Sequence, residues 1–125
     1  MNGLTLDAGG LIALDRNDRR VLALLARAEE LRAHITVPAT ALAQALRTPA
    51  KQARLSRLLR QPSTRIVPLD GPDASQVGIL LAATRSTDIV DAHVVICARR
   101  NAESIVTSDP GDLKRLDPGA RLVVV

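Results

Sequence analysis

The sequence contains no Phe, Tyr or Trp, only one cysteine, and no long uninterrupted apolar run. Its core must therefore be built from Leu, Val, Ile and Ala, and nucleic-acid bases cannot stack on aromatic rings. The lone Cys97 excludes an internal disulfide. Asp91 and His93 interrupt residues 89–98, so no stretch reaches the roughly 18 apolar residues of a membrane span, and no signal peptide is evident. We expect a cytoplasmic protein without membrane association.

The chain's charges are unevenly distributed. The 125 residues are 46% apolar and 24% charged, which predicts a single globular domain over residues 1–125. Residues 31–69 contain no Asp or Glu but hold seven Lys and Arg, and eight of the 13 carboxylates follow from Asp70 onward. This pattern predicts a phosphate-binding basic arm beside an acidic site, although a solvated helix face also explains the basic run.

Short apolar segments alternate with longer amphipathic ones. Strands are expected at residues 3–7, 34–38, 65–69, 104–107 and 121–125. Helices are expected at residues 8–14, from Asn17 or Asp18 to 33, at 41–47 with Thr40 as N-cap, and at 51–60, 70–84, 86–100 and 109–116. The alternation predicts an α/β domain of three layers, α/β/α, with a mostly parallel sheet of about five strands.

Three aspartates are expected to meet at one edge of this sheet. Asp7 ends the first strand, Asp109 lies just past the fourth, and Asp91 lies in the first turn of the preceding helix. Carboxylates that meet without Lys or Arg repel one another unless they are protonated or bridged by a cation. Oxygen ligands favour Mg²⁺ or Mn²⁺, which can deprotonate a water and stabilise charge on a phosphodiester under attack.

Each aspartate also has an alternative structural role. Asp7 can cap the helix that follows the first strand, and Asp88 is a natural N-cap that would place Asp91 at N3. Asp109 precedes a proline, as N-caps often do, and Asp112 then falls at N3. The metal hypothesis therefore depends on the convergence of the three acids rather than on any one of them.

Three segments resemble the PIN-domain ribonucleases, in particular VapC-type toxins of bacterial toxin–antitoxin pairs. They are residues 6–14 (LDAGGLIAL), 88–93 (DIVDAH) and 106–109 (VTSD). The resemblance implies a PIN-like fold, Mg²⁺-dependent RNA cleavage and metal-binding acids at Asp7, Asp91 and Asp109. It makes Asp88 and Asp112 accessory acids, and it implies a homodimer that pairs with a cognate antitoxin.

The chain departs from the family pattern in two places. The family usually has Thr-Ser after its first aspartate, where this chain has Ala8-Gly9. The family's second acid is a Glu, and the matching position here is Gln44, which offers a neutral oxygen. We expect the metal site to persist in a weakened form. The RNA backbone is expected to be bound by four basic residues: Arg47, Lys51, Arg54 and Arg57.

Two other functions fit the sequence less fully. The departures could leave a nuclease fold that only binds RNA or an antitoxin, and the apolar helical segments 21–31 and 77–84 offer surface for partners. A nucleotide-binding or phospho-acceptor domain is disfavoured, because no glycine-rich phosphate loop follows the first strand. The late lysine that a phospho-acceptor needs would have to be Lys114, which follows no predicted strand.

Overall fold

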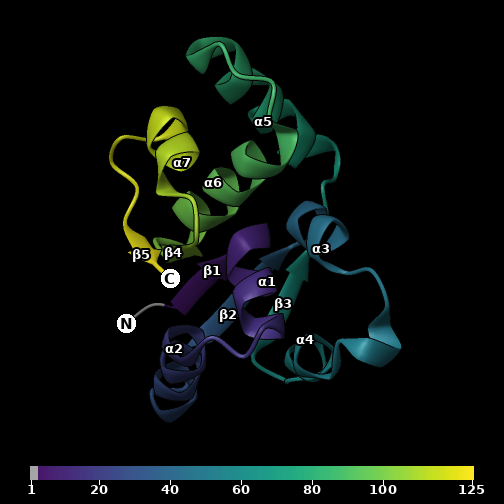
Figure 1. Cartoon of the computed structure of the whole chain (residues 1–125). Coiled ribbons are helices and arrows are strands. Elements are labelled where there is room, and N and C mark those ends of the chain that lie inside the picture. Colours follow the sequence, from purple (N-terminus) through teal and green to yellow (C-terminus); the bar gives the residue numbers. More distant parts are fainter. Residues whose placement is uncertain (1–2) are drawn as a thin grey trace.

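The computed structural model describes residues 3–125, which form a five-stranded sheet with helices on both faces (Figure 1). Its strands are β1 (Gly3–Leu6), β2 (His34–Pro38), β3 (Thr64–Val67), β4 (Ser104–Thr107) and β5 (Leu122–Val124). The helices are α1 (Ala8–Asp15), α2 (Arg19–Glu30), α3 (Ala39–Ala45), the 3₁₀ turn η1 (Pro49–Lys51), α4 (Ala53–Leu59), α5 (Gly71–Thr84), α6 (Ile89–Asn101) and α7 (Pro110–Leu116).

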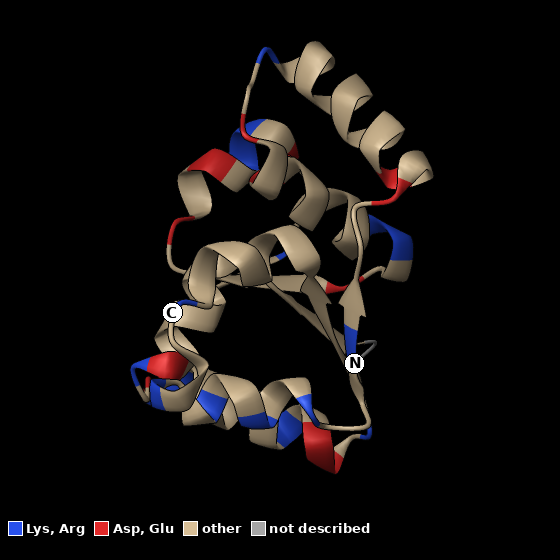
Figure 2. Ribbon diagram, turned by 90° about the vertical axis from the view of Figure 1, so that its right-hand side faces the viewer, with Lys and Arg blue, Asp and Glu red and all other residues tan. Residues whose placement is uncertain are grey.

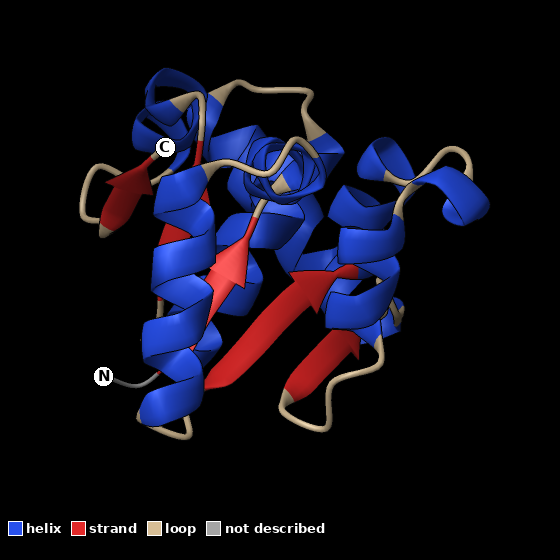
Figure 3. Ribbon diagram, turned by 60° about the horizontal axis from the view of Figure 1, so that its bottom comes forward, coloured by secondary structure: helices blue, strands red, loops and turns tan. Residues whose placement is uncertain are grey.

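All neighbouring strands are parallel, in the order β3-β2-β1-β4-β5. Parallel neighbours require a crossover between them, and helices provide every crossover here (Figure 3). The prediction of a three-layer α/β domain is thus confirmed. In the described part of the chain, no helix combines the length and apolar character needed to cross a membrane.

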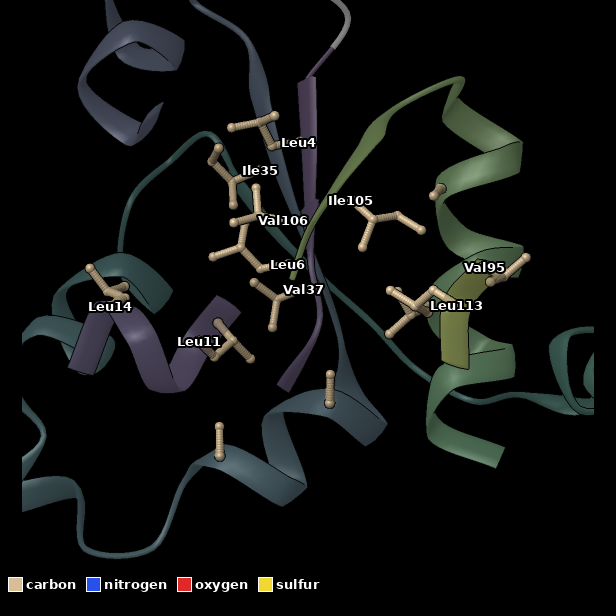
Figure 4. Close-up of a cluster of buried hydrophobic side chains, with 14 of the residues drawn as sticks. Leu4, Leu6, Leu11, Leu14, Ile35, Val37, Val95, Ile105, Val106 and Leu113 are labelled. Atoms are coloured by element: carbon tan, nitrogen blue, oxygen red, sulfur yellow. The ribbon is translucent and has the colours of Figure 1, made fainter. Parts of the chain in front are cut away.

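Alternating strand residues build two half-cores, one on each face of the sheet (Figure 4). Leu4 and Leu6 of β1 point toward α1, whereas Ile105 of β4 points toward α6 and its Val95. All four side chains are buried, as are most of the strand residues around them. The two half-cores fix α1 and α6 against the sheet, and these two helices begin with Asp7 as N-cap and with Asp91 in the first turn.

Two local predictions are wrong. Thr40 does not cap α3, because Pro38 occupies the N-cap and the Thr40 hydroxyl instead bonds His93 Nδ1 at 3.0 Å. The helix expected at residues 51–60 is divided at Gln52 into η1 and α4. The buried Gln52 amide accepts hydrogen bonds from the backbone N–H groups of Arg47 and Thr48, and these bonds hold the chain in a turn.

Candidate metal centre

Asp7 lies at the carboxyl end of β1, where it is buried and also caps α1. Its Oδ1 accepts a hydrogen bond of 2.7 Å from Gly10 N–H, and its own N–H donates to Val106 O on β4. A side chain at Gly10 would not fit, because its Cβ would lie 2.6 Å from that same Val106 carbonyl. The close approach of α1 to β4 therefore requires glycine, and it positions Asp7 beside the end of β4.

Thr107 belongs to the segment 106–109 that carries the family resemblance, where it was assigned no role of its own, and it lies between Asp7 and Asp109. Its buried hydroxyl accepts from Asp109 N–H at 3.0 Å, and it lies close enough to the Asp7 carboxylate to lower the pKa of that group. The Asp109 side chain is exposed and makes no capping hydrogen bond to α7, so the capping alternative fails at this position. Asp109 is thus held next to Asp7 with its carboxylate available.

Asp91 completes the cluster from the first turn of α6. The Asp88 side chain caps this helix by accepting from Asp91 N–H at 3.0 Å, as expected for an N-cap. Burial raises the pKa of Asp91 to about 6, with further contributions from the negative charges of Asp88, Asp7 and Asp109. Burial is also the main cause of the raised pKa of Asp7. The structure therefore brings the three predicted acids into one electrostatic cluster.

This cluster has the character of a site for a hard divalent cation. Among residues 3–125, no Lys, Arg or His forms a salt bridge with Asp7, Asp91 or Asp109. The donor set consists entirely of oxygen, which suits Mg²⁺ or Mn²⁺ and not zinc. The carboxylates are more widely spaced than a closed ligand cage, and Mg²⁺ commonly retains several waters and takes only one or two carboxylates. The residues present fit such an ion.

Ser108 provides a hydroxyl where the sequence seemed to lack one. A Cβ at Gly9 would lie 2.3 Å from Ser108 Oγ and 3.3 Å from Asp7 Oδ1. The Ser108 hydroxyl therefore occupies the space that a side chain at position 9 would fill, close to Asp7. This complementarity links two chain segments and could not be read from either one alone.

In the described part of the chain, Gln44 and the basic residues form no hydrogen bond or ion pair with the acid cluster. The Gln44 side chain is exposed on α3, and the Arg47 guanidinium donates to two carbonyls at the end of that helix. Arg54 and Arg57 line a separate cavity of about 400 Å³ between α2 and α4. In Figure 2, the helices at the bottom of the view carry several basic segments, and acidic segments mark the helix ends in the upper half.

A second group of possible ligands lies between α5 and α6. Among residues 3–125, only the ligand atoms of Asp73, His93 and Cys97 form a set of three within 4.8 Å of one another. His93 Nε2–H donates to Asp73 at 3.0 Å, and Arg100 donates to the other oxygen of Asp73. Burial raises the pKa of Asp73, but the bonds from Arg100 and His93 outweigh it and lower the pKa overall.

This second group is a satisfied structural network. Both ring nitrogens of His93 are engaged, since Nδ1 meets the Thr40 hydroxyl, and the charge of Asp73 is balanced by Arg100. Burial raises the pKa of the Cys97 thiol to about 12, so it stays protonated. His93 is fully buried, and the network joins α3, α5 and α6 around a core polar residue.

These features define a class: a parallel α/β domain that gathers aspartates at the carboxyl edge of its sheet. The PIN domain family model matches residues 5–118, and the chain belongs to this family. No curated protein matches the chain.

Solved structures share the fold at low sequence identity. A chain of VapBC2 from Rickettsia felis bound to a promoter DNA fragment has a TM-score of 0.68 at 15% identity, with 98% of both chains covered. FitAcB from Neisseria gonorrhoeae gives a TM-score of 0.65 at 20% identity over 95% of each chain. FitAB bound to an IR36 DNA fragment gives 0.67 at 18% identity, covering 97% of this chain and 94% of the other.

Proposed function

We propose that the chain is a Mg²⁺- or Mn²⁺-dependent endoribonuclease that hydrolyses RNA phosphodiester bonds as the toxin of a toxin–antitoxin pair. The observation that carries this proposal is the cluster of Asp7, Asp91 and Asp109, which has no cationic partner among the described residues. Membership of the PIN family supports an RNA substrate, because its members are typically ribonucleases. The site is expected to act in the cytoplasm, where RNA is available.

The proposed roles follow from the position of each acid. Asp7 is buried and fixed by two backbone elements, so we assign it and Asp91 as the main ligands, with the exposed Asp109 as a weaker one. Asp88 and Asp112 are accessory acids at the rim. When bound, the ion supplies Lewis-acid stabilisation of the phosphodiester and activates a water for attack.

The basic residues are proposed to bind RNA through its phosphates. They are exposed and follow α3 or lie along α4: Arg47, Lys51, Arg54 and Arg57. Without aromatic side chains, RNA affinity must come largely from such charge contacts and must fall steeply with salt. A charge-removing substitution among them should reduce the slope of affinity against salt concentration.

Cleavage of an RNA panel in Mg²⁺ and in EDTA tests the enzyme. We expect cleavage only with metal, and a loss of at least about 100-fold in Asp7→Asn and Asp91→Asn, as expected when a group essential to transition-state stabilisation is removed. Glu30→Gln is a matched control, since its side chain is exposed and distant in sequence from the site. Activity that survives both aspartate substitutions would show that Asp7 and Asp91 do not form the catalytic site.

The neutral Gln44 favours one alternative, a PIN module that binds RNA or an antitoxin without cleaving. Gln44→Glu should increase Mg²⁺-dependent cleavage if this position borders the site, and no gain would exclude Gln44 from it. Calorimetry with Mn²⁺ separates the two functions, because the enzyme requires a measurable binding heat that Asp7→Asn abolishes. Metal-independent RNA binding without cleavage would support the module.

An antitoxin partner is proposed on the apolar cavity between α2 and α4. The similar structures include VapBC2 and FitAB, each bound to a DNA fragment. The cavity is lined by Leu22, Leu25 and Leu58, with Arg54 and Arg57 among its lining residues, so it suits a segment that combines apolar and acidic side chains. A Leu25→Asp substitution should weaken co-purification with the cognate antitoxin by at least tenfold, whereas unchanged co-purification would place the partner elsewhere.

A homodimer is proposed on the apolar surface of α5. Ile79 is 65% exposed in the middle of this helix, and Ala82 and Ala83 on the same side of the helix are also exposed, so the apolar surface is contiguous, as at an interaction site. Light scattering during gel filtration should give twice the 13.3 kDa chain mass, and Ile79→Glu should return the monomer. A monomer in the unmodified protein at high concentration would refute this arrangement.

A further inference from the structure

A polar cavity of about 280 Å³ adjoins the acidic cluster. Its wall comes from the turn between α5 and α6, the start of α6, and α7, and consists of residues 84–88, Asp91, Asp112, Arg115 and Leu116. Because Asp91 forms part of this wall, the cavity opens directly beside the proposed metal centre. A volume just below the range of about 300–1,000 Å³ for small-molecule sites suits one nucleobase.

The charges in the wall favour a base over a phosphate. Three carboxylates line the cavity, from Asp88, Asp91 and Asp112, and they would repel an RNA phosphate. Carboxylates accept hydrogen bonds and donate none, so they select a group that presents N–H donors. The guanidinium group of Arg115 offers a flat face on which a base can stack, which matters because the chain has no aromatic residue.

The donors of guanine fit this wall best. Its Watson–Crick edge presents two adjacent donors, N1–H and N2–H, which match the two oxygens of one carboxylate. Adenine and cytosine place an acceptor nitrogen beside their amino group, and uracil has a single N3–H. The remaining guanine acceptor, O6, requires a donor, and the Arg85 guanidinium and the Thr87 hydroxyl are available in the same wall.

Asp112 is the carboxylate best placed for this task. Asp88 is already engaged, because its Oδ1 accepts from Asp91 N–H and caps α6. Asp112 comes from a different element, the first turn of α7, and its ion-pair partner is Arg115. That ion pair is solvent-exposed, at 79% for the Arg115 side chain, so it contributes little and can be exchanged for a base.

We propose that this cavity is a guanine subsite, in which Asp112 accepts from N1–H and N2–H and Arg85 binds O6 of a nucleotide next to the cleaved phosphate. The inference rests on the proposed ribonuclease function for its biological meaning. The binding of the base itself does not require cleavage or metal. The subsite would give the enzyme a preference for RNA sequences with an unpaired guanine beside the cleavage position.

Nucleotide binding tests the subsite directly. Backbone amide shifts of the full chain are followed by NMR in EDTA during titration with 5′-GMP, 5′-AMP, 5′-CMP, 5′-UMP and inorganic phosphate. We expect GMP to shift the amides around Arg85 and Asp112 with at least tenfold higher affinity than UMP, in line with the discrimination of a bidentate base contact. Asp112→Asn and Arg85→Ala should each remove this preference, and Glu30→Gln should retain it.

The outcomes separate the subsite from the ribonuclease function. Equal affinity for the four nucleotides, shifts reproduced by phosphate alone, or a preference that survives in both variants would overturn the subsite. If GMP binds selectively while no RNA is cleaved, the subsite stands and the ribonuclease function fails. If a randomised RNA is cleaved with no base preference near the cut and GMP shows no selectivity, the ribonuclease function stands and the subsite fails.

Discussion

The metal-free protein should become less stable as the pH rises from 4.5 to 7.5. The cause is Asp91, whose pKa is raised from its ordinary value of 3.8 to about 6 by burial and by the charges of Asp88, Asp7 and Asp109. At a pH between these two pKa values, the Asp91 carboxyl of the folded state holds a proton that the unfolded state has released. Stability therefore falls as pH increases, because the folded state binds more protons than the unfolded state.

The magnitude follows from the same pKa values. The difference between about 6 and 3.8 corresponds to about 3 kcal/mol at 1.36 kcal/mol per pKa unit, and about 2 kcal/mol of this is lost between pH 4.5 and 7.5, because the loss begins below pH 4.5. Asp7 contributes with the same sign, since its pKa is also raised. Asp73 acts in the opposite direction, because its lowered pKa gives stability that is lost only as the pH falls below the unfolded-state value. The metal-free chain should therefore be most stable near pH 4 to 5.

Urea unfolding followed by circular dichroism measures this effect, because the chain lacks the aromatic residues needed for intrinsic fluorescence. A loss of about 2 kcal/mol should lower the midpoint by about 0.7–2 M urea for a domain of this size. Asp91→Asn should flatten the profile, and millimolar Mn²⁺ should restore the midpoint at pH 7.5. Glu30→Gln should keep the wild-type slope. A flat or rising wild-type profile, or an unchanged slope in Asp91→Asn, would refute the reasoning.

The remaining predictions concern the packing that supports the site, and thermal unfolding by circular dichroism tests them all. Gly10→Ala should cost about 1–3 kcal/mol, because the new Cβ meets a β4 carbonyl at 2.6 Å that cannot shift freely; an unchanged melting temperature would contradict this close approach. Gly78→Ala should instead increase the free energy of unfolding by about 1 kcal/mol, since Gly78 lies inside α5 with no atom within 4 Å of the new Cβ. A lower melting temperature in this variant would contradict the open space around Gly78. Asp73→Ala should cost about 1–3 kcal/mol by leaving the buried His93 Nε2–H unpaired. Arg27→Ala removes an exposed ion pair and should cost under about 1 kcal/mol. Equal losses of stability in Asp73→Ala and Arg27→Ala would show that burial does not make the Asp73 bond more important than an exposed pair.

Hydrophobic periodicity was sufficient to predict the layers of this domain. The expected strands at residues 34–38 and 104–107 match β2 and β4, and the expected helix at residues 109–116 agrees with α7 within one residue at its start. Such patterns report which side of an element is buried, and this is a local property. The order of the elements along the chain and the positions of the strand ends also predicted that Asp7, Asp91 and Asp109 lie at one edge of the sheet.

Long-range hydrogen bonds explain what the sequence could not predict. Thr40 has the chemistry of an N-cap, but its hydroxyl bonds His93, which lies 53 residues away. The sequence predicts a helix through Gln52, but its buried amide accepts hydrogen bonds from two backbone N–H groups, and the helix is interrupted there. The Ser108 hydroxyl beside Gly9 depends in the same way on the meeting of two distant segments. A polar side chain has several possible partners, and only the fold selects among them.

Two kinds of buried aspartate in this domain differ in whether the chain supplies a compensating charge. Asp73 is buried, but Arg100 and His93 contact both of its oxygens and lower its pKa. Asp7 is equally buried, and burial raises its pKa, because the uncharged donors around it lower the pKa by too little to outweigh burial and the charge of Asp109. The chain has 17 Lys and Arg residues, and within residues 3–125 none forms a salt bridge with Asp7 or Asp91. The same side chain is thus stabilised at one buried position and left uncompensated at another. The uncompensated position is the one where the divalent ion proposed above would contribute most to stability and to chemistry.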